Sequence, residues 1–301
     1  MRKIKTICAV SLVSLLFLTS CVHHTPFVQE HYFEAMGDEG EVVMTFSVED
    51  ASRIIDMSDA ETGIFSALLK RVDRVSFALY NQSKSEDSSL SDYSFYGGAE
   101  GNIPSFLTNT SLLYSKEWDK IEEEENHYYR NDYLGLDVYS PKSGLLLFAS
   151  DEYMKAYNDT YKERTKKIES GLANRMADGL FGVYIRSPQT MIDIGIEIPQ
   201  AVLSKTLSIM LVFEEDDEQN IVLNGEITME SDKLAKSLSI LLKSSYISTK
   251  RRNREPLGDL TGLFTLDENK VSIANMLMND QQIESITGLF SPLTTLAAGE
   301  R

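Results

Sequence analysis

The sequence contains little cysteine, histidine or tryptophan. Among 301 residues there are two cysteines, four histidines and one tryptophan. Both cysteines, Cys8 and Cys21, lie near the N-terminus, and two are too few for a disulfide framework or a thiolate zinc site. We therefore expect a chain that folds without internal disulfides.

The motifs of common enzyme classes are also missing. The sequence has no G-x-S-x-G or S-x-x-K motif, no H-E-x-x-H, C-x-x-C or EF-hand pattern, and no G-x-x-x-x-G-K-[ST] loop. We expect a protein that is not an enzyme and that holds no metal or cofactor. A hydrolase remains an alternative, because its two carboxylates need no shared motif.

Positive charge is scarce. The chain has 29 Lys and Arg against 46 Asp and Glu, which gives a formal net charge of −17. Nucleic-acid binding depends on cations that neutralise phosphates. The composition therefore argues against a nucleic-acid partner.

Long apolar runs are scarce, and the most informative one lies near the N-terminus. Residues 7–18 are mostly apolar and follow a basic start that contains Arg2, Lys3 and Lys5. A transmembrane helix needs about 20 residues. This shorter run is typical of the apolar region of an export signal.

The segment Leu18-Thr19-Ser20-Cys21 resembles the lipobox of bacterial lipoproteins. The resemblance implies that residues 1–20 are a signal peptide, that Cys21 carries a diacylglycerol, and that this lipid holds the protein at a membrane. In the sorting system of that family, Val22 after the cysteine favours the outer membrane over the inner one. The alternative is an ordinary secretory signal in which the cysteine plays no part.

The remaining chain has no linker that divides it clearly. We interpret residues 21–40 as a flexible tether between the lipid and the folded part, because they show no sustained period. Residues 41–165 and 166–301 then form two halves. Four pairs of similar segments, in the same order in both halves, favour an internal duplication: 42–56 with 180–194, 75–79 with 207–211, 93–107 with 220–238, and 145–157 with 273–286.

The pattern of each half predicts an α+β fold. Apolar residues alternate in the strands, and short helices follow the strands, so we expect antiparallel sheets with helices packed on one face. An extra strand pair is expected at 116–132 and 135–140, with a weaker counterpart at 244–256 and 261–267. The two halves could be separate subdomains or share one long sheet.

Two groups of residues are candidate binding sites. Tyr153, Tyr157 and Tyr161 share one helical face and could stack on a sugar or hold an apolar ligand, although such a stripe more often packs against a core. Four cations in five residues could bind phosphate, anionic headgroups or an acidic partner, although they could also form a solvated turn. These are Lys250, Arg251, Arg252 and Arg254.

Other polar clusters fit structural roles. We place His23, His24 and His31 in the tether, and we expect His127 to be exposed or to line a sheet edge. The acidic runs at 122–125 and 214–218 are interpreted as solvated, the second as a hairpin loop. The sequence GGAEGN at 97–102 predicts a β-bulge or tight turn rather than a phosphate site.

These observations predict a non-catalytic, lipid-anchored lipoprotein of the bacterial cell envelope that binds an envelope protein or helps to maintain the envelope. One alternative is a ligand-binding lipoprotein with an apolar or carbohydrate pocket between the halves, lined by Tyr153, Tyr157, Met276 or Met278. The other is the hydrolase with scattered carboxylates.

Overall fold

The computed structural model divides the chain into two units, Met1–Glu30 and His31–Arg301. The lipobox, Cys21, His23 and His24 lie outside the described residues. The structure describes residues 30–50, 70–81, 93–123, 126–150, 153–188, 199–257, 260–279 and 282–283.

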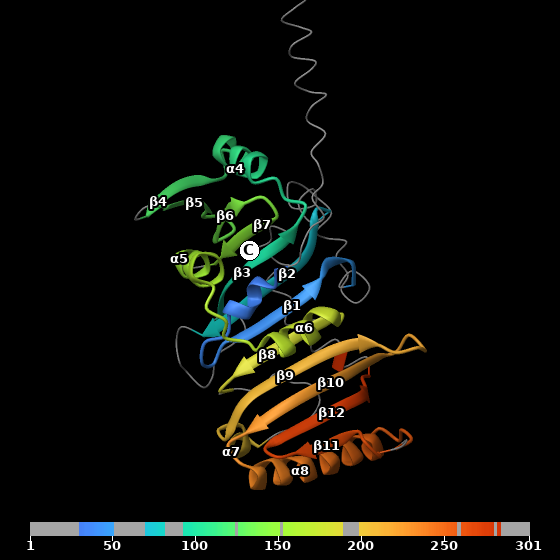
Figure 1. Cartoon of the computed structure of the whole chain (residues 1–301). Helices are drawn as coiled ribbons and strands as arrows, with labels where there is room; N and C mark the ends of the chain where they lie inside the picture. The colour runs from blue at the N-terminus through green and yellow to red at the C-terminus, as the bar shows by residue number, and fades with distance from the viewer. Residues whose placement is uncertain are drawn as a thin grey trace, which may run out of the picture. The chain divides into compact units, whose positions relative to one another are not determined.

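The second unit is built on one antiparallel sheet of twelve strands (Figure 1). Its order is β11-β12-β10-β9-β8-β1-β2-β3-β7-β6-β5-β4. This confirms the predicted antiparallel α+β class. The strands are β1 (Val42–Ser47), β2 (Val72–Asn81), β3 (Tyr93–Gly101), β4 (Asp119–Glu123), β5 (Asn126–Asn131), β6 (Leu136–Lys142), β7 (Leu145–Ala149), β8 (Phe181–Arg186), β9 (Thr206–Glu215), β10 (Ile221–Met229), β11 (Phe264–Asp267) and β12 (Lys270–Leu277).

Short helices accompany the sheet, and one helix is long. The longest, α8, spans Asp232–Arg252, and a π-helix, η4, follows α5 directly. The described helices are η1 (Tyr32–Ala35), α4 (Ser105–Tyr114), α5 (Tyr153–Ala156), η4 (Tyr157–Glu163), α6 (Ser170–Asp178), α7 (Gln200–Leu203) and α8. In the part of the chain that the structure describes, no helix is both long and apolar enough to span a membrane.

The helices cover both faces of the sheet, which corrects the expectation of one covered face. Alternate side chains of a strand point to opposite faces, and all five residues of β7 are buried. On one face Leu146 and Phe148 join a core that includes residues of α4, α7 and α8. On the other face Leu145 and Leu147 join a core with residues of η1, α5 and α6. Strands that are apolar on both sides need cover on both sides.

The sheet runs through both predicted halves. Strand β1 pairs with β2 on one side and with β8 on the other, with Met44 opposite both Phe77 and Val183. Outward from this centre the order is β1, β2, β3, β7 in one direction and β8, β9, β10, β12 in the other. The four predicted segment pairs thus occupy corresponding places in the strand order. Common ancestry of the halves, and the boundary at residue 165, remain predictions.

Two local expectations are wrong. Residues 31–40 were expected to be tether, yet Tyr32, Phe33 and Met36 are buried in the core of the second unit. The chain therefore begins to pack ten residues earlier than its composition indicates. The weak strand expected at 244–256 is instead helical as far as Arg252, because α8 continues through it.

Candidate functional site

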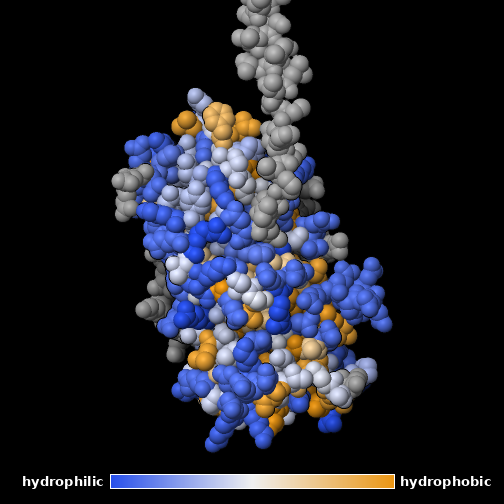
Figure 2. All heavy atoms as spheres, viewed as in Figure 1, coloured by the Kyte–Doolittle hydropathy of each residue, from blue (hydrophilic) through white to orange (hydrophobic). Residues whose placement is uncertain are grey.

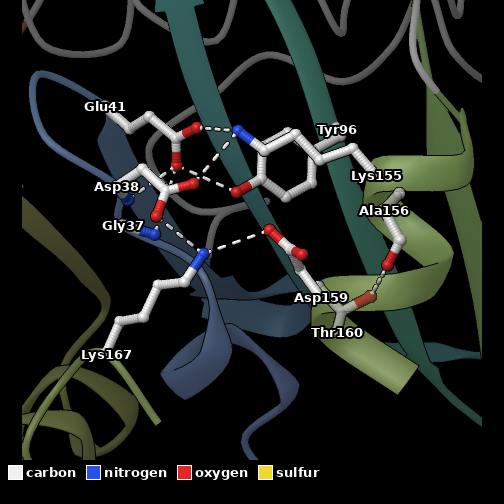
Figure 3. A network of polar contacts seen from close by, with 9 residues as sticks. All are labelled: Gly37, Asp38, Glu41, Tyr96, Lys155, Ala156, Asp159, Thr160 and Lys167. Atoms are coloured by element: carbon white, nitrogen blue, oxygen red, sulfur yellow. Dashed lines mark hydrogen bonds and ion pairs between the residues drawn. The ribbon is translucent and has the colours of Figure 1, made fainter. Parts of the chain in front are cut away.

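The most polar feature of the interior is a network of charges around Glu41 (Figure 3). The Glu41 side chain is 4% exposed. Its carboxylate accepts hydrogen bonds from the backbone N–H of Asp38 at 2.9 Å and from the Tyr96 hydroxyl at 2.9 Å. The Lys155 ammonium also donates to it. A buried carboxylate with this many donors is fully compensated.

Two lysines connect the network to the rest of the unit. Lys155 of α5 lies 3.2 Å from the Asp38 carboxylate and over the Tyr96 ring, with its ammonium 4.8 Å from the ring centroid. Lys167 bridges Asp38, at 2.8 Å, and Asp159 of η4, at 3.1 Å. The network thereby ties residues 37–41 to the helical segment that follows β7.

The protonation states follow from these contacts. Burial alone would lower the pKa of Lys155, but the hydrogen bond and charge of Glu41, followed by those of Asp38, outweigh it and raise that pKa. Burial opposes the effect at Asp38 as well, yet Lys167 and then Lys155 lower the pKa of its carboxyl. Burial and the Glu41 carboxylate raise the pKa of the Tyr96 hydroxyl.

This chemistry favours a structural role. A catalytic lysine needs a depressed pKa so that it can lose its proton near neutral pH, and Lys155 has the opposite shift. Within the described ranges, no group of three or more His, Cys, Asp or Glu is arranged to hold a metal ion. The network acts as a clamp on the segment that precedes β1.

A π-helix forms part of this clamp. Segment η4, Tyr157–Glu163, carries Asp159 into the network, and the Thr160 hydroxyl donates to the Ala156 carbonyl. π-Helical turns are rare and frequently mark functional positions. Here the wider turn places an acidic residue beside Lys167.

Among the residues that the structure describes, the two most exposed large apolar side chains lie on α4. Its Phe106 and Tyr114 are 77% and 81% exposed, and Leu107 and Leu113 are 58% and 51% exposed. Figure 2 shows this apolar group at the top of the space-filling view, where Figure 1 places α4. The helix has no charged residue in its ten positions. Asn109 holds the helix to β6. Its side-chain Nδ2 donates to the Ser140 carbonyl, and its Oδ1 accepts the Ser140 backbone N–H.

The predicted tyrosine stripe belongs to the core. Tyr153 is 2% exposed, and its ring stacks on Tyr128 with centroids 4.7 Å apart. Tyr157 and Tyr161 are partly buried against the same core, with their rings 5.5 Å apart. The geometry favours the packing interpretation over a sugar-binding one.

The predicted cation cluster lies at the end of α8. Lys250 pairs with Glu255 at 2.5 Å and lies over the Tyr246 ring. Arg251, Arg252 and Arg254 are exposed. The structure thus brings the cluster to the end of a helix rather than into the predicted turn, and its binding role remains a prediction.

The structure also places the other polar clusters. His127 lies on β5, next to the edge strand β4, with its ring 4.7 Å from that of Tyr139. The run at 214–218 leads into the β9–β10 hairpin, where Asp216 accepts the backbone N–H of Asn220. The bulge or tight turn predicted in GGAEGN is not found there: residues 97–101 are part of β3, and the register shift of the β2–β3 pairing lies on β2, between Val72 and Arg74.

Sequence reasoning missed the roles of Glu41 and Lys155 and the exposed apolar face of α4. Nothing local marks Glu41 or Lys155, because their partners are distant in the chain. A signal existed for α4: residues 105–114 are uncharged in a strongly charged protein, and Phe106, Leu113 and Tyr114 recur at the helical period.

Comparisons with known proteins support the fold. No protein-family model matches the chain, and no curated protein matches it. Crystal structures of TP0453 resemble it. Crystal form I has a TM-score of 0.57 at 14% identity and covers 85% of this chain and 96% of that chain. Crystal form III has a TM-score of 0.55 at 14% identity and covers 86% and 97%. At this identity the likeness concerns the fold alone.

Proposed function

We propose that this protein is a non-catalytic, lipid-anchored lipoprotein of the bacterial cell envelope that binds an envelope protein through α4. The lipobox residues 18–21 support the anchor, and Val22 favours the outer membrane. The observation that carries the binding role is the exposed apolar face of α4, formed by Phe106, Leu107, Leu113 and Tyr114.

The composition of α4 favours a protein over a lipid surface as its partner. Helices that lie on bilayers typically carry Lys or Arg on their polar face. Helix α4 has none, and its remaining residues are Ser, Thr, Asn and the buried Leu112. Aromatic residues without charges, surrounded by hydrogen-bonding groups, are typical of the centre of a protein interface.

The non-catalytic part rests on two observations. The sequence lacks the nucleophile and metal motifs described above, and Lys155, the partly buried lysine of the network, is held protonated by Glu41 and Asp38. The residues expected to line a pocket between the halves do not face a common space. Tyr153 and Met276 are both buried, and they belong to cores on opposite faces of the sheet.

The anchor is tested by lipid labelling and cell fractionation of the native protein and of Cys21→Ser. We expect the variant to lose the label and to leave the membrane fraction, because the proposed lipid holds the protein at the membrane and no helix among the described residues is long and apolar enough to span it. Retention of label and membrane location in Cys21→Ser would refute the lipobox interpretation.

The binding role is tested by cross-linking in intact cells and recovery of the lipoprotein. The double variant Phe106→Ser, Tyr114→Ser should reduce the recovery of a stoichiometric partner at least about tenfold, since each side chain contributes roughly 1.5–3 kcal/mol when buried. Ile240→Ser, at a 59% exposed position on α8, is the matched control and should change nothing. Equal recovery from the double variant, or α4-dependent binding of the Cys21→Ser chain to phospholipid vesicles, would contradict a protein partner.

A further inference from the structure

A pocket of about 310 Å³ lies where the second unit begins. It is separate from α4, and its residues come from two segments that are distant in the sequence. This volume is at the small end of the range for ligand sites. The lining residues are His31, Tyr32, Glu34, Ala35, Arg164 and Lys166.

The pocket is lined by two cations, Arg164 and Lys166, and by one carboxylate, that of Glu34. The guanidinium of Arg164 lies over the Tyr32 ring, 4.4 Å from its centroid, and the Lys142 ammonium is 5.2 Å from the same ring. Lys166 pairs with Glu34 at 2.6 Å, and its side chain is 61% exposed. Two cations thus lie over one tyrosine ring, and a third, Lys166, lines the same pocket beside the Glu34 carboxylate. The protein as a whole has a net charge of −17.

The backbone at the pocket is strained in two places. His31 has φ 49° and Arg164 has φ 48°, both in the left-handed region. This region costs a residue other than glycine of order 1–3 kcal/mol and is found disproportionately at ligand sites. Two such residues, from separate segments, line the same pocket.

His31 adds a polar atom without a partner. Within the described residues its Nδ1 is buried and makes no hydrogen bond. Burial, and then the positive charge of Arg74, lower the pKa of the imidazole. A neutral imidazole has one N–H donor, so it can donate to an anion without adding the cost of a buried charge.

We infer that this pocket binds a phosphate group. Arg164 supplies a guanidinium fork, which matches phosphate oxygens in a bidentate manner, Lys166 supplies an ammonium at the rim, and His31 supplies an N–H donor. Three donors around one group suit an anion with several acceptor oxygens better than a two-oxygen carboxylate.

Two sources can deliver such a group: a free phosphate or the headgroup of a phospholipid. Residue 31 is ten residues beyond Cys21, and ten extended residues span at most about 33–36 Å. The headgroup source rests on the proposed anchor, because that anchor would keep the pocket near a membrane. Binding of free phosphate does not depend on the anchor.

The test is a calorimetric titration of the full native lipoprotein in non-ionic detergent. The probes are inorganic phosphate, short-chain phosphatidic acid and, as a zwitterionic reference, short-chain phosphatidylcholine. We expect phosphatidic acid or inorganic phosphate to bind more tightly than phosphatidylcholine. Preference for phosphatidic acid over inorganic phosphate assigns the headgroup source, and equal binding assigns the free anion. Absence of binding by both phosphates overturns the inference.

Variants then locate the binding. Arg164→Asn removes the fork but keeps a residue that tolerates the left-handed backbone, and it should weaken phosphate binding at least about tenfold. Lys166→Gln should weaken it less, because the side chain is at the rim. Lys205→Gln, a 51% exposed lysine paired with Glu230, is the matched control. Unchanged affinity in both pocket variants, or an equal loss in Lys205→Gln, would show that the pocket is not the site.

Discussion

At the residue scale, the structure depends on charges that compensate each other inside the protein. Glu41 and Lys155 are separated by 114 positions in the sequence, and neither side chain is freely exposed. An isolated buried charge costs several kcal/mol, whereas a paired one with further hydrogen bonds is close to neutral. The network therefore contributes little stability as a whole, yet each member is expensive to remove alone.

Lys155→Met should destabilise the protein by about 3 kcal/mol, because it leaves the Glu41 carboxylate buried without its cation. The double variant Lys155→Met, Glu41→Gln should recover more than about 1 kcal/mol of that loss. Urea unfolding of the three proteins measures both values. Lys120→Met removes a surface pair with Glu122, 40% and 75% exposed, and should change the unfolding midpoint far less than Lys155→Met does, because water and salt screen an exposed pair. Equal losses at Lys155 and Lys120 would show that burial of Glu41 is unimportant.

A second prediction at this scale concerns Gly97. A Cβ atom there would lie 2.3 Å from the Ser76 carbonyl oxygen and 2.7 Å from the Phe77 Cβ. Gly97→Ala should therefore force β2 and β3 apart and cost about 2–3 kcal/mol. At the neighbouring Gly98, the nearest atoms to a Cβ would be the flexible side-chain ends Leu145 Cδ1, at 3.3 Å, and Leu147 Cδ2, at 3.4 Å, so Gly98→Ala should cost less than about 1 kcal/mol. Thermal unfolding distinguishes them, and similar losses would refute the close-approach argument.

At the element scale, the sequence predicts the central strands well and the helices less well. Strands such as β2 and β9 show apolar residues at alternate positions, and both are found where expected. Helix α8 was predicted too short. Its buried positions Leu238 and Leu242 continue to the partly buried Tyr246 at a spacing of four, but Ser, Thr and Ile residues beyond 243 resemble a strand locally.

The candidate surfaces could be predicted only in part. A helix after β3 was expected from the pattern at 93–107, but its exposure follows from its packing against β6, in which Leu112 is its buried residue. Local patterns show which residues are apolar, and the packing of distant strands decides which of them remain uncovered. The tyrosine stripe shows the opposite case, an apolar surface that becomes covered. Tyr153 packs against Tyr128 of β5, and nothing in the sequence around Tyr153 indicates that this strand lies beside it.

At the scale of the whole molecule, one sheet makes the two sequence halves interdependent. β1 belongs to the first half and β8 to the second, and both contribute to the same core through Phe46 and Phe181. The sequence did not decide between two subdomains and one shared sheet, because strand patterns do not indicate which strand edges pair. The β1–β8 pairing resolves that question.

This interdependence predicts one cooperative unfolding transition for the described unit. Phe213→Ala, in β9, removes a 1% exposed ring stacked on Phe181 at 4.0 Å and should cost about 3–5 kcal/mol. The single tryptophan, Trp118, lies in the first half, so its fluorescence should shift to a lower denaturant midpoint together with far-UV circular dichroism. A shift in circular dichroism without one in Trp118 fluorescence would show that the halves unfold separately.

The clamp at residues 37–41 also has a mechanical consequence. The segment leads directly into β1, the sixth of twelve strands, which is hydrogen-bonded on both sides. If Cys21 carries the proposed lipid, a pull between the membrane and the folded unit reaches β1 through this segment. The load first meets the buried side chains of residues 32–36, then the ion pairs of Lys155 and Lys167, and then a strand held along both edges. An edge strand such as β4 could separate one hydrogen bond at a time. Strand β1 separates only when its hydrogen bonds to β2 and to β8 break together.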